Sequence, residues 1–549
     1  MTDNQHPYLL HRLERLNAIG IALSVERDHN RLLEMILLGA KEITNADGGT
    51  LYTITQDKHL KFEIMRNETL NISLGGTTGK DIPFLPLPLY LADGSPNLTT
   101  VAAYATLNDK TVNIENAYLA QDFDFTGTRK FDEKTGYHSQ SFLTIPMKNH
   151  EAEVIGVLQL INAIDVNTNK IIPFSAANQS LVESLASQAA VAMTNHNLID
   201  GLKRLFEAFI ELIAEAIDQK SPYTGGHCKR VPELTMMLAQ AAVDTKTGPL
   251  REFTLTEKEF YELKIAGWLH DCGKVTTPES VMDKSTKLSA IFDRIHYIDQ
   301  RFELLKQQAE CDMLKKKIAA LHINKQDGIN KQHDFSKLES EFEAFKLKCD
   351  EDRDFLRKSN FGSEYMTPED QQRVRDIAAM RLINAEGLAT SFLDDDESYN
   401  LNIARGTLTS EEREIINNHI IVTINMLESL PYPKGLQRVP EYAGGHHERM
   451  DGKGYPKGLT REQMSVPARV MGIADIFEAL TSKDRPYKKA KTLSESLHIL
   501  GKMKLDNHID PDLFDIFVRE KIYLKYAELF LEPEQIDDVD ESKIPGYQV

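Results

Sequence analysis

The chain has 549 residues, of which 41% are hydrophobic and 27% charged, and its formal net charge is −19 at pH 7. This acidic balance excludes a general binder of nucleic acid or of anionic membranes, whereas the length allows several domains with true hydrophobic cores. The four cysteines have no CxxC spacing, no run of 18 apolar residues occurs and the N-terminus is polar, which together predict a cytoplasmic protein without disulfides or a transmembrane helix.

The first third of the chain predicts an α+β unit. Apolar residues first recur at helical spacing, then alternate with period two, and a long helix is expected to begin near Ser175. This order, helix then antiparallel strands then helix, is typical of a sensory module. The elements predicted before Ser175 are helices within residues 9–44, a hairpin over 49–65, and strands over 111–114, 141–147 and 154–163.

Residues 1–195 form the expected first domain, and about residues 10–195 resemble a GAF domain of the cyclic-nucleotide type, through the strings FDEKTGYHSQSFLTIPM and EVIGVLQLINA. Such modules carry Asn-Lys, then Phe, then Asp-Glu. Asn162 and Phe174 match, but Ala163 replaces the Lys and Asn178-Gln179 replaces the acidic pair. Both charges are lost together, so the fold can survive while binding of the usual ligand is in doubt. Two alternatives stay open: a sensor of an unknown small molecule, or a dimerisation module with an empty pocket.

Residues 176–220 predict one long connecting helix. Its apolar residues are spaced by three, four or seven, the only glycine is Gly201, and no proline occurs before Pro222. This near-heptad stripe favours a parallel coiled-coil homodimer over a helix that packs only on its own domain.

Histidines and aspartates that suit a metal centre follow in five separate segments. His446-His447 stand in GGHHERMDGKGYP, and His270-Asp271 end an apolar helical run in GWLHDCGK. Adjacent histidines reach one metal only if the backbone bends, which the preceding glycine pair would permit. A buried His-Asp pair is costly unless metal or hydrogen bonds compensate it. The other segments add three candidate ligands, His227, His419 and Asp475. Together these side chains are enough to bind two metals bridged by Asp271.

HDCGK, HHERMDGKGYP, ARVMGIADIFEAL and DRPYK together resemble the HD-GYP family, a branch of the HD metal-dependent phosphohydrolases. The likeness covers about residues 205–500, within an expected catalytic domain of residues 205–510, and is interrupted by one inserted segment. It implies an all-helical domain that hydrolyses cyclic di-GMP to pGpG and/or GMP by metal-activated hydroxide attack. It also implies two transition-metal ions, iron or manganese, with a third as the alternative.

The resemblance also implies a role for each site residue. Lys274 would stabilise developing charge, Arg485 and Lys488 would grip the second phosphate, and Tyr455 would face the substrate. Glu448 and Asp451 would either orient the histidine rings or bond the loop that carries them. The first metal would take His227, His270, Asp271 and Asp475, and the second Asp271, His419, His446 and His447.

The distance in sequence between Asp271 and His419 is far larger than the compact family pattern needs, which predicts a helical insertion over about residues 286–405. Thr409 and Glu412 then form a predicted capping box ahead of His419, and residues 511–549 are expected to be a helix and an acidic tail. Two other functions stay open: a phosphodiesterase for another cyclic dinucleotide such as cyclic GMP-AMP, and a non-catalytic receptor. The complete ligand set argues against the receptor.

Overall fold

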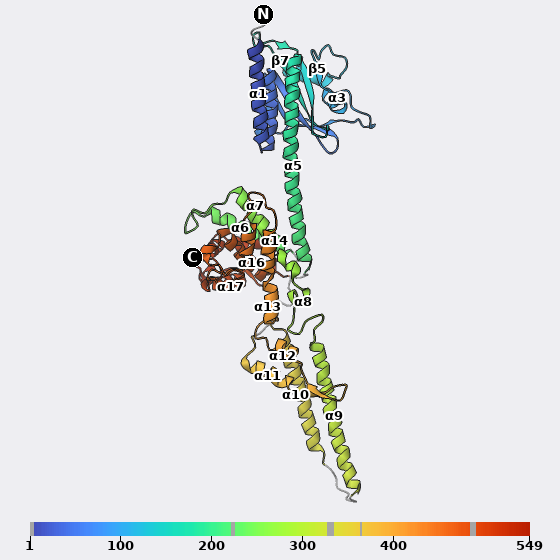
Figure 1. The fold of residues 1–549 in the computed structure, drawn as a ribbon, viewed down its shortest axis with the longest axis vertical. Helices are drawn as coiled ribbons and strands as arrows, with labels where there is room; N and C mark the ends of the chain where they lie inside the picture. The colour runs from blue at the N-terminus through green and yellow to red at the C-terminus, as the bar shows by residue number, and fades with distance from the viewer. Residues whose placement is uncertain (1–4, 221–225, 327–333, 363–364, 484–489, 549) are drawn as a thin grey trace. The chain divides into compact units, whose positions relative to one another are not determined.

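The chain divides into two compact units, residues 1–206 and 207–549, and the boundary lies within helix α5 (Ala176–Lys220) (Figure 1). Within the part of the chain that is described, no helix combines the length and the apolar character needed to cross a bilayer. The structure is a computed structural model, and it describes residues 5–220, 226–326, 334–362, 365–483 and 490–548.

An antiparallel sheet forms the centre of the smaller unit. Its strand order is β3-β2-β1-β7-β6-β5, with β4 paired to β2 and β8 paired to β7. The predicted hairpin is β1–β2, and the other predicted strands correspond to β5, β6 and β7. The strands are β1 (Ala46–Ile54), β2 (His59–Asn67), β3 (Ile72–Gly75), β4 (Leu87–Pro88), β5 (Val112–Ile114), β6 (Phe142–Lys148), β7 (Val154–Ile164) and β8 (Ile171–Ile172).

Helices cover both faces of this sheet. Because successive strand residues point to opposite faces, Leu51 joins the core beneath α1, α2 and α5, whereas Tyr52 packs with α3. Figure 1 shows α1 and α5 beside each other and α3 separate from them. An α+β unit followed by one continuous helix is therefore confirmed. The other helices are α1 (Gln5–Val25), α2 (His29–Thr44), the short turn η1 (Gly76–Thr78), α3 (Val101–Asn108) and α4 (Thr126–Thr135).

Asn162, which matches the cyclic-nucleotide GAF motif, holds neighbouring backbone in place. Its backbone is left-handed, with φ of 56°, a conformation that Asn tolerates better than most residues. Its amide oxygen accepts from the backbone of Gln140 and Ser141, and its amide nitrogen donates to Tyr137 and to the carbonyl of His138. Every polar atom of this buried side chain is thus used in fastening the segment before β6.

The positions of the missing ion pair hold neutral residues. Ala163 is buried in the core, and the Asn178 amide oxygen accepts a hydrogen bond of 2.7 Å from the Arg12 guanidinium. The lost Lys–Asp pair therefore leaves no buried charge without a partner at these two positions.

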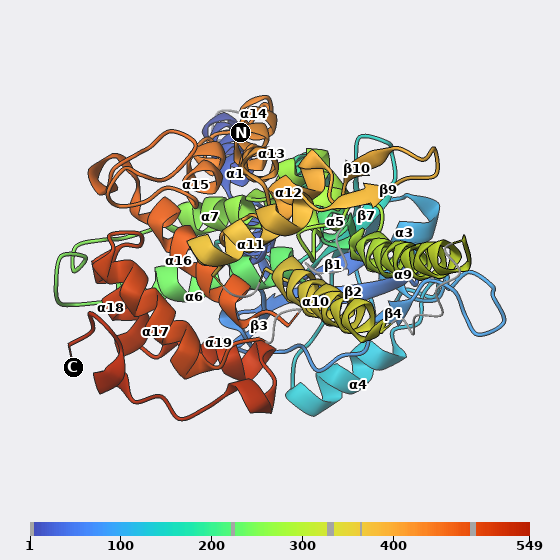
Figure 2. The same ribbon diagram turned by 90° about the horizontal axis from the view of Figure 1, so that it is seen from below.

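In the described part of the larger unit, the regular secondary structure is helical apart from one small hairpin in the inserted segment. Its main core gathers α6, α7 and α14 to α19, and Figure 2 shows α18 and α19 beside α6. The elements outside the insertion are α6 (His227–Asp244), α7 (Glu257–Leu269), η2 (Cys272–Thr276), α8 (Glu279–Met282), α13 (Ser410–Asn417), α14 (His419–Glu428), α15 (Val439–Gly444), η3 (Arg461–Gln463), α16 (Val466–Thr481), α17 (Leu493–Leu505), α18 (Pro511–Arg519), α19 (Ile522–Phe530), η4 (Pro533–Gln535) and η5 (Glu541–Lys543).

The inserted segment has a hydrophobic core of its own, around Phe302, Leu356 and Phe392. The predicted helical character is confirmed, and the two longest helices described there, α9 and α10, lie side by side (Figure 1). Most of the connection between them falls outside the described residues. The predicted Thr409–Glu412 capping box forms at the start of α13. The elements are α9 (Ile295–Gln326), α10 (Ser336–Asn360), α11 (Pro368–Ala378), β9 (Arg381–Ile383), β10 (Ala389–Ser391) and α12 (Asp395–Leu401).

Candidate metal centre

Five elements of the larger unit bring the candidate ligands together. His227 begins α6, His270 caps the end of α7 with Asp271 next to it, and His419 begins α14. His446 and His447 follow α15, and the remaining ligand, Asp475, lies within α16. Helix termini and a mid-helix aspartate from segments far apart in sequence thus converge in one buried place.

Gly273 explains how Asp271 and His419 come so close. A Cβ atom at Gly273 would lie 2.0 Å from the carbonyl oxygen of His419 and 2.6 Å from the backbone nitrogen of Thr423. The backbone N–H of Gly273 also donates to the Thr423 hydroxyl at 2.9 Å. Only glycine allows η2 to pack directly against the first turn of α14.

The glycine pair before the two adjacent histidines serves packing rather than a special backbone conformation. Neither Gly444 nor Gly445 has a positive φ. A Cβ at Gly444 would lie 2.8 Å from the side chain of Ile424 on α14, and one at Gly445 would lie 2.9 Å from Ala468 on α16. The expected bend is therefore provided by the end of α15, and the glycines let this helix end fit between α14 and α16.

The first cluster contains two histidines and two carboxylates. His227 Nε2 lies 3.2 Å from Asp271 Oδ2, 3.3 Å from Asp475 Oδ1 and 3.3 Å from His270 Nε2. His270 Nε2 lies 3.3 Å from Asp271 Oδ2 and 3.7 Å from Asp475 Oδ1. The four side chains all direct polar atoms at one small space.

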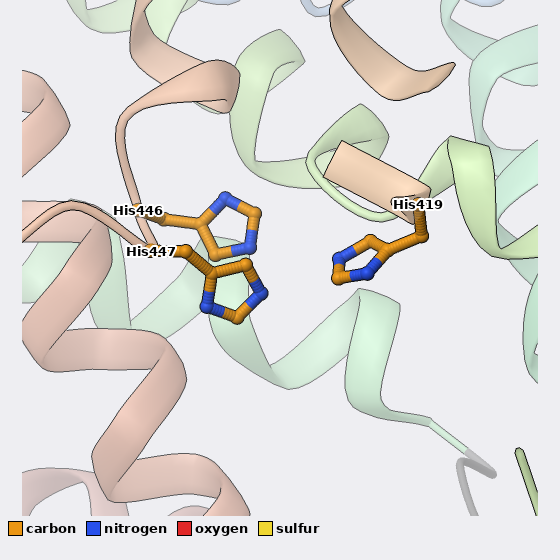
Figure 3. A group of neighbouring side chains, drawn as sticks. All are labelled: His419, His446 and His447. Atoms are coloured by element: carbon orange, nitrogen blue, oxygen red, sulfur yellow. The ribbon is translucent and has the colours of Figure 1, made fainter. Parts of the chain in front are cut away.

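The second cluster consists of histidines that face the other oxygen of Asp271. His419 Nε2 lies 3.2 Å and His446 Nε2 4.0 Å from Asp271 Oδ1. Figure 3 shows the rings of His446 and His447 together on one side, with the His419 ring opposite them. In each cluster the nearest ligand atoms of three side chains lie within 4.8 Å of one another. Asp271 is thus positioned between the clusters with one oxygen toward each.

The hydrogen bonds assign the ring protons. Nδ1 donates to the carbonyl of the residue three positions earlier in His270, His419 and His446, at 2.6, 2.5 and 2.6 Å. In a neutral imidazole the other nitrogen is then an acceptor with a free lone pair. These three Nε2 atoms are therefore prepared to bind a cation.

The residues present fit divalent metal ions. Among the described residues, Asp271 Oδ1, His419 Nε2 and His446 Nε2 are buried and have no aligned hydrogen-bond partner. Buried polar atoms in native proteins are almost always satisfied, and lone pairs that face one another repel. A cation in each cluster would satisfy these atoms, and imidazole with carboxylate suits iron, zinc and manganese.

The clusters differ in their charge. Burial lowers the pKa of His270, but the neighbouring carboxylate of Asp271 reverses this and raises the pKa to about 9. Burial lowers the pKa of His447 to about 4 and that of His446 well below its ordinary value. The carboxylates of the first cluster therefore favour bound cations, including protons, whereas burial disfavours a positive charge on His446 and His447 in the second.

Lys274 and Tyr455 lie at this centre. Lys274 Nζ is 2.5 Å from Asp271 Oδ2; burial lowers its pKa, but the charge of Asp271 outweighs that effect and raises the pKa to about 12. The Tyr455 ring stacks on His447 with 4.8 Å between the ring centroids. Arg485 and Lys488, predicted to grip the second phosphate, lie outside the described residues.

Glu448 and Asp451 make hydrogen bonds within the loop that follows the histidine pair. The buried carboxylate of Glu448 accepts from the backbone N–H groups of Lys457 and Leu459, at 2.7 and 2.9 Å. Asp451 pairs with Arg449 at 3.0 Å. Their hydrogen bonds thus hold the segment that carries Tyr455.

Sequence reasoning missed the carboxylate that contacts His227. Glu478 Oε2 lies 2.5 Å from His227 Nδ1, and Arg230 contacts the other oxygen of Glu478. The spacing could have revealed both residues, because Glu478 follows Asp475 by three positions and Arg230 follows His227 by three, which places each pair on one helix face.

The family comparisons agree with this architecture. Residues 28–193 match the GAF domain model, and residues 394–513 match the HD domain model. The HD match includes His419, His446 and His447 and begins within the inserted segment, so the ligands before the insertion fall outside it. The fold and site thus define a protein with an N-terminal GAF domain, a long helix and a C-terminal helical HD domain.

Curated relatives match parts of the chain. A 3'3'-cGAMP-specific phosphodiesterase from Vibrio cholerae is 42% identical over 85 residues, or 16% of this chain and 20% of the relative. A cyclic di-GMP phosphodiesterase from Pseudomonas aeruginosa is 37% identical over 114 residues, which are 21% of this chain and 26% of the relative. A cyclic di-GMP phosphodiesterase from Thermotoga maritima is 34% identical over 126 residues, which cover 21% of this chain and 34% of the relative. The matched part is thus between a fifth and a third of the length of these relatives.

Among solved structures, the GAF domain of a phosphoenolpyruvate-protein phosphotransferase from Acinetobacter matches 35% of this chain and 98% of its own length. The identity is 16% and the TM-score 0.26.

Proposed function

We propose that this chain is a metal-dependent phosphodiesterase that hydrolyses cyclic di-GMP to pGpG and/or GMP. The observation that carries the proposal is the convergence of three orphaned, buried ligand atoms around Asp271. The names of the Pseudomonas and Thermotoga relatives supply the substrate class.

The chain's own residues would divide the work as follows. Bound divalent ions, iron or manganese, would supply a deprotonated water at neutral pH and neutralise charge on the phosphoryl oxygens. Asp271 would hold both ions, because its two oxygens face different clusters. Lys274 would provide a fixed positive charge beside Asp271 that attracts the phosphodiester. Tyr455, stacked on His447, would limit how the substrate approaches, and Arg485 and Lys488 would bind the second phosphate.

A second candidate substrate is 3'3'-cyclic GMP-AMP. The relative with the 42% match is named as specific for it, and the match to the Pseudomonas cyclic di-GMP enzyme is lower. Metal chemistry at the phosphate does not read the base, so the metal-binding residues are compatible with both substrates.

The test combines metal analysis of the purified full chain with product chromatography on a panel of cyclic dinucleotides. We expect two ions per chain and a linear dinucleotide or mononucleotide product from cyclic di-GMP. Preferred turnover of the hybrid dinucleotide would favour the second candidate. Tight nucleotide binding without turnover in the metal-loaded chain would instead indicate a receptor.

We further propose that the GAF domain regulates this site through α5, in a homodimer. Leu198, Leu205 and Leu212 recur every seven residues, Leu202 and Phe209 follow the same period four positions later, and all five are largely exposed. Such a double heptad row is what a two-stranded coiled coil buries. A second copy of the chain is the partner that this stripe fits best, and the GAF ligand stays open.

The last turn of α5 makes contacts that suit such regulation. The carboxylate of Asp218 accepts from the backbone N–H groups of Gly226 and Cys228, on either side of His227. Lys220 donates to the carbonyls of Val275 and Thr277, just beyond Lys274. A displacement of this helix end would therefore reach segments that carry residues of the site.

A further inference from the structure

Three histidines of the centre are oriented by neutral backbone carbonyls, whereas His227 is oriented by a carboxylate. His270, His419 and His446 donate from Nδ1 to the carbonyl three residues earlier. His227 Nδ1 instead faces Glu478 Oε2 at 2.5 Å. Glu478 is 1% exposed, so this contact is shielded from solvent.

Arg230 contacts Glu478 in a way that leaves one oxygen to His227. Its Nε lies 2.7 Å and its terminal nitrogen 2.6 Å from the same oxygen, Oε1. A simple ion pair between α6 and α16 would favour the two-pronged geometry in which the guanidinium bonds both oxygens. Here the guanidinium compensates the buried charge, and Oε2 is reserved for the imidazole.

We infer that Glu478 is a positioning residue that makes His227 a stronger metal ligand, so that the cluster of His227, His270, Asp271 and Asp475 binds its ion more tightly than the cluster of His419, His446 and His447. A carboxylate that accepts from Nδ1 keeps the proton there, fixes the ring and raises the basicity of Nε2. The first cluster also has Asp475, whereas the second shares only Asp271. This inference rests on the metal-binding part of the proposed function.

The decisive variant is Glu478→Gln, which keeps the size and removes the charge. If the amide nitrogen faces His227, two donors meet and the ring proton is driven to Nε2, where it blocks metal binding. If the amide flips, its nitrogen faces Arg230, again donor against donor. Neither orientation satisfies both neighbours. Glu478→Asp keeps the charge and serves as the conservative variant for partial rescue.

A matched control exists in the same unit. Glu262 on α7 is also a buried carboxylate, 4% exposed, but it accepts from the backbone N–H of Arg438 and contacts no proposed ligand. Glu262→Gln therefore tests what the loss of a buried carboxylate does to folding alone.

The experiment is a calorimetric titration of metal-stripped full chain with Mn²⁺, which requires no turnover. We expect two classes of site in the native chain, and in Glu478→Gln a loss of about 10–100-fold in affinity confined to the tighter class. Glu478→Asp should be intermediate and Glu262→Gln unchanged.

Equal weakening of both classes, or no change in either, would overturn the inference, as would an equal effect of Glu262→Gln. If Glu478→Gln does not fold, full native affinity in Glu478→Asp decides against it as well. A native chain that binds no Mn²⁺ at all would instead count against the proposed function.

Discussion

Buried polar side chains are arranged differently in the two units. In the GAF domain, buried Asp132 accepts from the backbone and hydroxyl of Ser139 and from Tyr118, at 2.8, 2.7 and 2.7 Å. Asn162 likewise uses all its polar atoms in protein hydrogen bonds. In the HD domain, Asp271 Oδ1 is equally buried but faces two imidazole nitrogens without an aligned hydrogen bond.

This difference separates structural from functional polar groups. A satisfied buried network contributes rigidity and needs no ligand, whereas a convergent set of unsatisfied atoms is costly unless something binds there. Unsatisfied atoms alone are not sufficient, since single hydroxyls such as that of Tyr526 are also without an aligned partner in the described part of the chain. The metal centre is distinguished by several such atoms that face one another.

The largest expected effect is that of Asp271→Ala. The substitution removes the carboxylate whose two oxygens face different clusters, so turnover should fall to background and metal content should drop below two ions per chain. Elemental analysis and product chromatography measure both. The matched control is Asp132→Ala in the GAF domain, which should leave metal content unchanged; a similar loss of metal in this control would contradict the distinction between the units.

Metal loading should stabilise the HD domain and leave the GAF domain unaffected. A ligand at 100 times its Kd adds about 2.7 kcal/mol to the free energy of unfolding of the state that binds it. Calorimetric unfolding of the full chain with and without Mn²⁺ should show one transition shifted upward. A shift of both transitions by the same amount would mean that the two domains unfold as one unit.

Asn162→Ala should destabilise the GAF domain and leave metal binding in the HD domain unchanged. Loss of its side chain leaves the buried backbone of Gln140 and Ser141 without acceptors, at a cost of about 1–3 kcal/mol in the stability of the GAF domain. Unfolding in urea measures the loss, and a Mn²⁺ titration of the same variant should match the native chain. Altered Mn²⁺ affinity would show that the polar network of the GAF domain reaches the metal centre.

The smallest effect is expected from changes in the phase of α5. One alanine inserted near Gly201 turns everything beyond it by about 100°, whereas seven residues restore the heptad phase. The single insertion should therefore change turnover by a larger factor than the seven-residue insertion. Steady-state rates of verified dimers measure this. Equal rates in the native chain and in both insertion variants would mean that the GAF domain anchors the protein without gating the reaction.

Local sequence was sufficient for the elements and for the identity of the candidate ligands. Period-two alternation predicted β1 and β2, the long uninterrupted apolar stripe predicted α5, and the His and Asp motifs predicted a metal centre. These features depend on neighbours within a few positions, where spacing and side-chain chemistry act directly. The same local character explains the limits: β4, in the Gly- and Pro-rich stretch of residues 76–103, and α3, which begins at the end of that stretch, were not expected.

Only the tertiary structure decided which groups meet across the chain. Glu478 touches His227 because α6 and α16 pack together, and Gly273 is required because α14 passes within contact distance of η2. The particular backbone groups that Glu448 and Asn162 bind were likewise not specified by the motifs in which these residues stand. The physical reason is that burial and packing between distant segments select each partner, and no periodicity or spacing within one segment records that choice.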